Sequence, residues 1–276
     1  MKLYISFDVE GLAGITNWDQ EEEERDLFLR SVHQQIAYVI EGIQTSPKND
    51  QIETITLADA HGRSRSLDYH ILGDLDPRIQ LICGRPRKEF MVHGIGGHDL
   101  AFFVGYHGGS GQQRANMDHT FSSCVHQLNI NGIKCNEALV NAIYAKEMGV
   151  PVGLIIGDSG LYDQLILEGY MPYVDFVTTK KSISRFACKF KNPQVLRKET
   201  IEAVHRVLAQ DPSKLSMPDM ASPYLLTLEF NTTDQADRAA IMPGVQRMTG
   251  YKLSLSLERA SDLINTISVL TRLARD

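Results

Sequence analysis

The stretch "ISFDVEGLAGI", residues 5–15, closes a short apolar run with two carboxylates, Asp8 and Glu10. The run that leads into it, "KLYISFD", is rich in strand-forming residues and predicts a first buried strand. After a glycine-containing turn, apolar residues recur at helical spacing from Asp19 to Ile43. The stretch therefore predicts a strand, a loop and a helix, with two acidic side chains where the strand ends.

The same alternation continues through the first two-thirds of the chain. Further strands are predicted at "ETITLADAHG", "RIQLICG", "LAFFVGYHGG" and "VPVGLIIGD", with a hairpin around Asn131-Gly132 and a helix from Glu137 to Met148. Strands that alternate with helices predict an α/β fold in which helices flank a mostly parallel central sheet.

The last third of the chain has a different pattern. A helix, the strand-like runs "YLLTLEF" and "YKLSLSLE" and a final helix from Ala260 to Ala274 predict a smaller α+β portion. We divide the chain into an α/β metal-binding catalytic domain, residues 1–190, and a C-terminal portion, residues 191–276. The second can equally be continuous with the first, and we expect it to serve oligomerisation.

Composition narrows the class of protein. The 276 residues are 43% hydrophobic and 22% charged, as in globular proteins. A formal net charge of −6 argues against nucleic acid or an anionic membrane as a partner. No apolar run reaches the ~18 residues of a membrane span, and no signal-peptide core follows Met1, so we expect a cytoplasmic protein. The four cysteines form no C-x-x-C pair, which disfavours a structural zinc knot.

Polar side chains close several of the predicted strands. The carboxyl ends of parallel strands meet at one edge of a sheet, and side chains at i and i+2 share a face. Two close carboxylates repel unless a cation lies between them. Carboxylates combined with imidazoles suit zinc, with manganese or cobalt as alternatives. The candidate ligands are Asp8, Glu10, His61, His107 and Glu137.

Five ligands exceed what one catalytic zinc with an open position uses, so the pattern favours two divalent ions with Asp8 between them. His119, in the loop "ANMDHTFSS", is a candidate for proton transfer beside the metals. Each residue also has a structural alternative. Asp8 could cap a turn, His61 could simply hydrogen-bond a loop, and the glycines beside His107 also mark ordinary turns.

An ordered series of motifs resembles the M55 family of metallopeptidases, the D-aminopeptidases. The series is "SFDVEGLAGI", "DAHG", "FVGYHGG", "MDHTF", "LNINGIKCNEALVNA", "VPVGLIIGD", "KKSISRFA" and "IMPGV". The resemblance implies a binuclear zinc aminopeptidase that acts on short peptides and forms a ring-shaped homo-oligomer of the decamer type. It also implies that His119 is catalytic and that the metal ligands are Asp8, Glu10, His61, His107 and Glu137.

The reaction we expect is attack of metal-bound hydroxide on the first peptide carbonyl, which releases the N-terminal residue. The resemblance implies that this residue can be a D-amino acid. His119 would protonate the leaving amine or steady the oxyanion. Ser159 departs from the family pattern, which often has an acidic residue there. Two alternatives stay open: a metal-dependent hydrolase of another class, such as a phosphoesterase or deacetylase, and a non-catalytic α/β binding or assembly protein.

Overall fold

A computed structural model describes residues 1–275 and contains two main sheets. The larger has six parallel strands in the order β3 (Ile79–Ile82), β2 (Thr54–Asp59), β1 (Lys2–Phe7), β4 (Leu100–Tyr106), β7 (Val152–Gly157) and β8 (Asp175–Thr178). The predicted α/β architecture is confirmed, and the strands that end near Asp8, His61 and His107 are neighbours.

The second sheet is antiparallel and has five strands. Their order is β12 (Gln246–Arg247), β13 (Lys252–Leu257), β11 (Tyr224–Phe230), β5 (Val125–Ile130) and β6 (Ile133–Lys134). The hairpin predicted at Asn131-Gly132 joins β5 to β6. A separate hairpin pairs β9 (Lys180–Ser184) with β10 (Ala187–Phe190), and no strand was predicted there.

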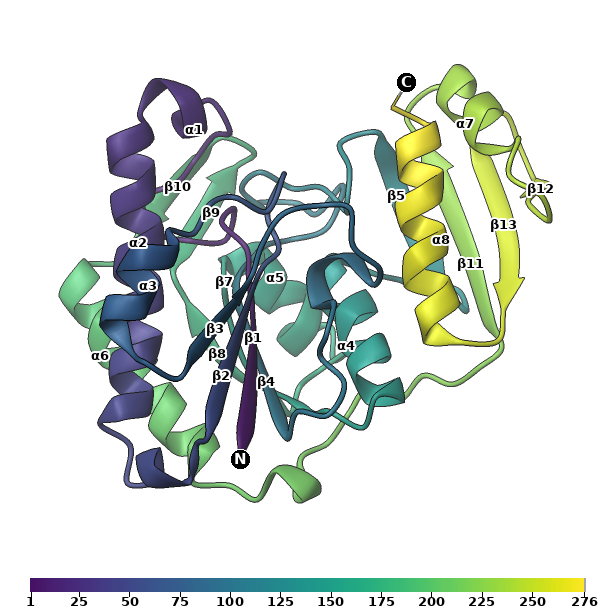
Figure 1. The fold of residues 1–276 in the computed structure, drawn as a ribbon. Coiled ribbons are helices and arrows are strands. Elements are labelled where there is room, and N and C mark those ends of the chain that lie inside the picture. Colours follow the sequence, from purple (N-terminus) through teal and green to yellow (C-terminus); the bar gives the residue numbers. More distant parts are fainter. Residues whose placement is uncertain (276) are drawn as a thin grey trace.

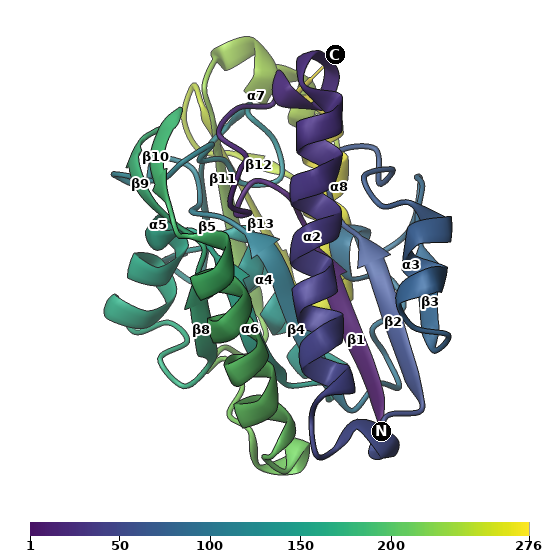
Figure 2. The same ribbon diagram turned by 90° about the vertical axis from the view of Figure 1, so that its left-hand side faces the viewer.

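Helices lie on both faces of the parallel sheet (Figure 1). On one face α2 (Arg25–Gln44) and α6 (Pro193–Leu208) run side by side, as Figure 2 shows. On the other face α4 (Glu137–Glu147) separates the parallel sheet from α8 (Ala260–Leu273), which covers the antiparallel sheet. The remaining helices are short: α1 (Gln20–Glu23), α3 (Tyr69–Leu75), α5 (Ser159–Tyr162) and α7 (Thr233–Ala239), with single turns η1 (Asn49–Gln51), η2 (Phe90–Val92), η3 (Asp163–Leu167) and η4 (Pro212–Lys214).

Elements from the two sides of the point at which we divided the sequence pack against each other. Strand β5, from the first part, pairs with β11 from the second. Helix α6, from the second part, packs against α2 and beside β7 of the first. The two sheets are therefore interlaced along the chain.

The alternation of side chains along β1 explains how the core is divided. Leu3, Ile5 and Phe7 pack in the apolar cluster under α2 and α6. Tyr4 belongs to the cluster on the α4 side. Because successive strand residues face opposite ways, Asp8 continues the face of Tyr4 once the strand ends. The sequence pattern thus directs the first carboxylate towards α4.

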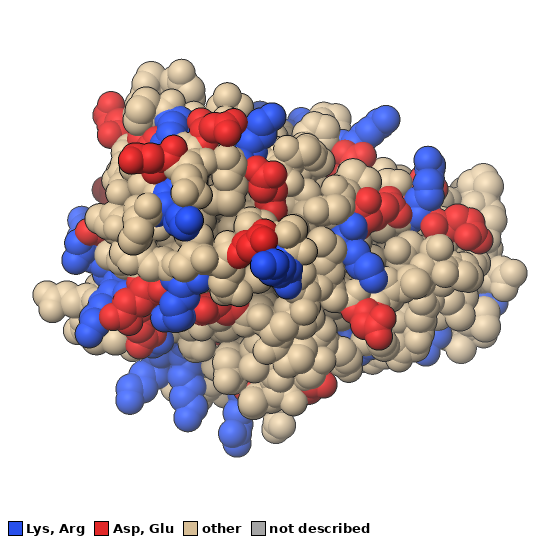
Figure 3. Space-filling view, turned by 90° about the horizontal axis from the view of Figure 1, so that it is seen from below, with Lys and Arg blue, Asp and Glu red and all other residues tan. Residues whose placement is uncertain are grey.

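The surface at the amino ends of the parallel strands has mixed charge. Figure 3 shows Lys and Arg side chains interspersed with Asp and Glu on this face, without a continuous patch of one sign. Within residues 1–275, no helix combines the length and apolar character needed to cross a membrane.

Candidate metal centre

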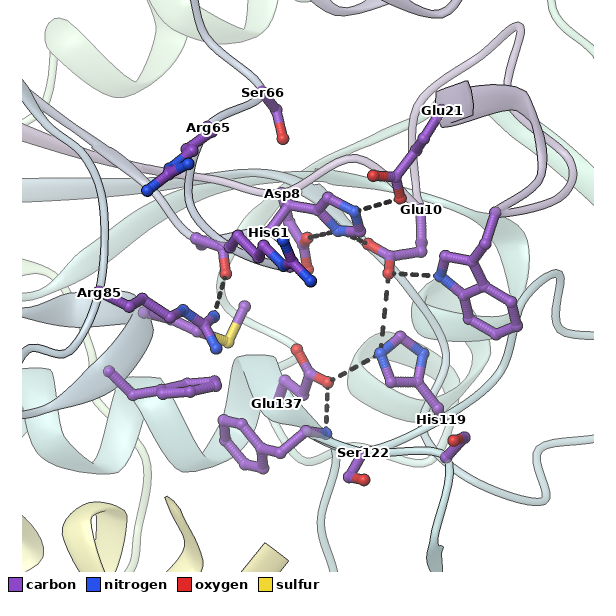
Figure 4. Close-up of a pocket in the computed structure, with 18 of the residues that line it drawn as sticks. Asp8, Glu10, Glu21, His61, Arg65, Ser66, Arg85, His119, Ser122 and Glu137 are labelled. Atoms are coloured by element: carbon purple, nitrogen blue, oxygen red, sulfur yellow. Dashed lines mark hydrogen bonds and ion pairs between the residues drawn. The ribbon is translucent and has the colours of Figure 1, made fainter. Parts of the chain in front are cut away.

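The five candidate ligands lie together at the carboxyl edge of the parallel sheet. Two of them follow β1, one follows β2, one follows β4, and the fifth is the first residue of α4. Every one is at most 6% exposed. All of them except His107 line a cavity of ≈ 690 Å³ (Figure 4). The five residues are Asp8, Glu10, His61, His107 and Glu137.

Close backbone approach brings the ends of β1 and β4 together. Gly105 has φ +78, and a Cβ there would lie 1.9 Å from the carbonyl oxygen of Asp8. A Cβ on Gly11 would lie 1.8 Å from the carbonyl oxygen of Tyr106. Only glycine fits at both positions, so the backbones at the two strand ends can approach each other this closely.

Asp8 lies between two imidazoles. Its Oδ1 is 3.4 Å from Nδ1 of His61, and its Oδ2 is 3.8 Å from Nε2 of His107. One oxygen therefore faces each histidine. Ligand atoms within 4.8 Å of one another form two groups that share Asp8, the first with Glu10 and His61 and the second with His107 and Glu137.

We call the five candidate ligands the cage. His107 provides a test of whether the cage suits a cation. Its Nδ1 lies 3.0 Å from the carbonyl oxygen of Gly108, which can only accept, so Nδ1 carries the proton. The buried Nε2 then offers a lone pair, yet it has no hydrogen-bond partner within residues 1–275. Burial, with His119 nearby, lowers the pKa of His107 to about 3. A neutral imidazole that points a lone pair between carboxylates is a suitable ligand for a divalent ion.

His61 is held from both sides. Its Nδ1 lies 3.0 Å from Oε2 of Glu10, and its Nε2 lies 2.6 Å from Oε1 of Glu21, a residue of α1. Burial alone would lower the pKa of His61, but Glu10, Asp8 and Glu21 together raise it well above its usual value. With a metal on Nδ1, Glu21 would keep the Nε2 proton and the ring orientation, as carboxylates behind zinc-binding histidines do.

His119 lies in the same cluster. Its Nδ1 is 2.9 Å from the carbonyl oxygen of Met117, so this nitrogen carries a proton and Nε2 faces the cage. Nε2 lies 3.7 Å from Oε1 of Glu10 and 3.5 Å from Oε1 of Glu137. The ring stacks on His107 with centroids 4.3 Å apart. His119 is also close enough to Glu10 and His107 to form a third group of possible ligands.

The carboxylates strain the cage electrostatically in the absence of a cation. Burial and then Glu10 raise the pKa of Asp8 well above its usual value, and the same two causes raise the pKa of Glu137 to about 8. Burial would also raise the pKa of Glu10, but His61 outweighs it and holds that pKa low. Crowded carboxylates that resist ionisation are stabilised when a divalent ion neutralises them.

Two further residues hold Glu10, and sequence analysis missed both. Trp18 donates from Nε1 to Oε1 of Glu10 at 2.9 Å, and its ring packs edge-on against His119. The buried ammonium of Lys180 donates to the carbonyl oxygens of Glu10 and Ile15, each at 2.6 Å. Burial lowers the pKa of Lys180 to about 8. The motif "KKSISRFA", quoted only for its resemblance, contained this lysine.

A family model described as D-aminopeptidase matches residues 1–269. The chain belongs to the M55 peptidase family. It is therefore a peptide hydrolase, as we predicted. No sequence among the curated proteins matches this family member.

A solved structure has a similar fold. The Zn-dependent D-aminopeptidase DppA from Bacillus subtilis, described as a self-compartmentalizing protease, is 25% identical and superposes with a TM-score of 0.89. The match covers 100% of this chain and 99% of DppA. The similarity thus includes the antiparallel sheet as well as the parallel one.

Proposed function

We propose that this peptidase is a binuclear zinc aminopeptidase that releases the N-terminal residue of short peptides. The observation that carries the proposal is the position of Asp8, whose two oxygens face two different histidines. Glu10 and His61 would complete one metal site, and His107 and Glu137 the other. Mixed carboxylate and imidazole ligands favour zinc, and the similar DppA is Zn-dependent.

Bound ions would supply Lewis acidity, which polarises a carbonyl and lowers the pKa of water to ~7. The protein residues perform the remaining work. The lone pair on Nε2 of His119 faces the cage because Nδ1 is tied to Met117. His119 can therefore take up a proton and deliver it to the leaving amine, and Trp18 packs against its ring to orient it.

The carboxylates of the site could also orient the amino end of the substrate. Oε1 of Glu10 and Oε1 of Glu137 lie within 4 Å of Nε2 of His119. A neutral amine that hydrogen-bonds to either carboxylate would place the first peptide bond beside His119. The family description supports a D-amino acid as the released residue. It equally disfavours the phosphoesterase, deacetylase and non-catalytic alternatives.

Assembly and location complete the proposal. We infer a ring-shaped homo-oligomer of the decamer type, because DppA is described as self-compartmentalizing. Large apolar side chains are exposed on the C-terminal portion, including Ile241 at 77% and Met248 at 57%, and would be covered at such an interface. We place the protein in the cytoplasm. Sedimentation velocity would determine the number of subunits.

The proposed activity is tested with matched dipeptides that carry an L- or a D-residue at the amino end. Mass spectrometry should detect release of the first residue, and a chelator should abolish it. Restoration by added zinc is the control for damage by the chelator. Cleavage that survives complete metal removal, or no cleavage of either peptide by zinc-loaded protein, would contradict the proposal.

A further inference from the structure

The cavity above the metal centre is lined by both acidic and basic side chains. The candidate metal-binding carboxylates in its lining are buried, and arginines also contribute, among them Arg65 and Arg85. Figure 4 shows Arg85 and His119 at different sides of the cluster in this view. A short peptide would match this lining if its amino end lay at the metal centre and its carboxylate lay at an arginine. A cavity of ≈ 690 Å³ is of the size that holds small ligands.

Arg85 is fixed in place before any ligand binds. Its guanidinium lies 3.8 Å from the ring centroid of Phe90. Nε donates to Oγ of Ser64 at 3.2 Å, and Nη2 donates to the carbonyl oxygen of Ala60 at 3.0 Å. These three contacts hold the planar group rigidly, so little conformational entropy is lost when a further partner binds.

Arg85 has capacity for one more partner. Within residues 1–275 it makes no ion pair, and its Nη1 has no hydrogen-bond acceptor. Burial, with Arg87 nearby, lowers the pKa of Arg85 to about 10, so the group remains a cation at neutral pH. A half-buried cation that makes no ion pair, at the wall of a substrate cavity, is suited to bind an anion.

Arg87 offers a comparison two residues away. Its Nε, Nη1 and Nη2 donate to the carbonyl oxygens of Phe90, Ile82 and Asp59 respectively. All of its donor groups thus have protein partners, and it does not line the cavity. Arg87 supports the backbone, whereas Arg85 presents an unused donor group to the cavity.

We propose that Arg85 binds the C-terminal carboxylate of a short peptide whose amino end lies at the metal centre, and so selects peptide acids over peptide amides. The inference rests on the proposed aminopeptidase function and adds the substrate class to it. A carboxylate on a substrate side chain has the same chemistry, so the test separates these two sources.

The test compares three peptides whose first residue has the configuration, L or D, that the enzyme cleaves. They are alanyl-alanine, its C-terminal amide, and alanyl-glutamic acid α-amide, which has only a side-chain carboxylate. The full-length zinc-loaded enzyme should prefer the acid over alanyl-alanine amide by about 10- to 100-fold in kcat/KM, as expected for one charge-assisted hydrogen bond. Arg85→Gln should raise KM for the acid and reduce the preference to within about twofold. Arg85→Lys should retain part of it.

Arg87→Gln is the matched control, because a merely structural loss lowers turnover of acid and amide together and leaves their ratio unchanged. Equal turnover of acid and amide by the unaltered enzyme, or an Arg85→Gln enzyme that keeps the preference, would overturn the inference. Turnover of the glutamic acid α-amide at the rate of the acid would overturn the assignment to the C-terminal carboxylate.

Equilibrium binding separates failure of this inference from failure of the proposed function. Reduced-bond analogues of alanyl-alanine and its amide contain no cleavable amide at the first position, and their dissociation constants can be measured by calorimetry. Tighter binding of the acid, lost in Arg85→Gln, supports the role of Arg85 even if no peptide is cleaved. Equal binding of both analogues counts against it even if peptides are cleaved.

Discussion

The two sheets of the molecule bury different kinds of side chain. Strand β11 of the antiparallel sheet buries Tyr224, Leu226, Leu228 and Phe230. No charged side chain is buried on the strands of that sheet within the described residues. At the carboxyl edge of the parallel sheet, carboxylates and imidazoles are buried against one another.

This difference separates stability from function. Buried apolar side chains stabilise a fold, whereas buried carboxylates cost free energy unless they are paired. The parallel edge therefore bears an electrostatic cost that the antiparallel sheet avoids. A metal centre explains that cost, and the following changes test the explanation from the largest expected effect to the smallest.

Asp8→Asn removes the carboxylate that belongs to both groups of candidate metal ligands. We expect the purified variant to hold less than two zinc ions per chain and its turnover to fall by at least about a thousandfold, since metal ions supply several kcal/mol to such reactions. Plasma mass spectrometry and dipeptide turnover measure the two effects. Unchanged zinc stoichiometry would show that Asp8 does not bridge.

His119→Ala should separate metal binding from turnover. We expect turnover to fall by about 10²- to 10⁴-fold, the usual contribution of a general acid or base. Zinc content should stay at the level of the unaltered protein, because the other five side chains remain. If zinc is lost together with activity, His119 belongs among the ligands instead.

Leu228→Ala should lower stability without lowering zinc content, because Leu228 is 1% exposed in the antiparallel sheet. We expect a loss of about 2–5 kcal/mol in the free energy of unfolding, as for other buried leucines. Zinc content per folded chain should not change. Denaturant unfolding and metal analysis of the folded fraction provide the measurements, and loss of zinc from folded protein would contradict the separation of the two sheets.

Glu137→Gln tests the electrostatic cost through its pH dependence. In metal-free protein the pKa of Glu137 is raised to about 8 by burial and Glu10, against 4.5 in the unfolded chain. The folded state therefore holds a proton that the unfolded state releases between these values. The stability due to that proton is complete below pH 4.5 and is lost as pH rises towards 8.

Glutamine does not titrate, so metal-free Glu137→Gln should gain thermal stability relative to the unaltered protein as pH increases across this window. Melting temperatures measured in chelator from pH 4.5 to 8 follow the difference. A difference that stays constant with pH would mean that Glu137 ionises normally.

Glu21→Gln should have the smallest effect. The amide can still accept from Nε2 of His61 but no longer carries the charge that faces it. Loss of a carboxylate behind a metal-binding histidine typically costs about 10- to 100-fold in metal affinity. Glu23→Gln, an exposed change on the same helix, is the control. Competition with a zinc chelator gives the affinities, and equal values for the two variants would remove Glu21 from the site.

Sequence patterns predicted the parts of this structure that depend on local periodicity. The strand ends at Asp8, His61 and His107 and the helix that begins at Glu137 follow from apolar runs and turn residues. The patterns predicted that the side chains converge if these parallel strands are neighbours, and the structure shows that the strands are adjacent. The helix predicted from Asp19 to Ile43 is divided, since α1 ends at Glu23 and α2 begins at Arg25.

Residues that act through distant contacts could not be predicted in this way. Lys180 reaches the carbonyl of Glu10 across 170 positions, and Glu21 reaches His61 across 40. Neither contact produces a periodic signal. Arg85 lies in a loop. Only the folded structure shows that its Nη1 has no acceptor among the described residues, whereas Nη1 of Arg87 donates to the carbonyl oxygen of Ile82.

The most direct measurement is anomalous diffraction at the zinc edge from crystals of the zinc-loaded protein. Our account predicts two peaks, one at a bonding distance of ~2.0–2.1 Å from Nδ1 of His61 and the other at that distance from Nε2 of His107. Asp8 should bind both ions, which should lie ~3.5–4 Å apart. A single peak, or two peaks of which one does not contact Asp8, would contradict it.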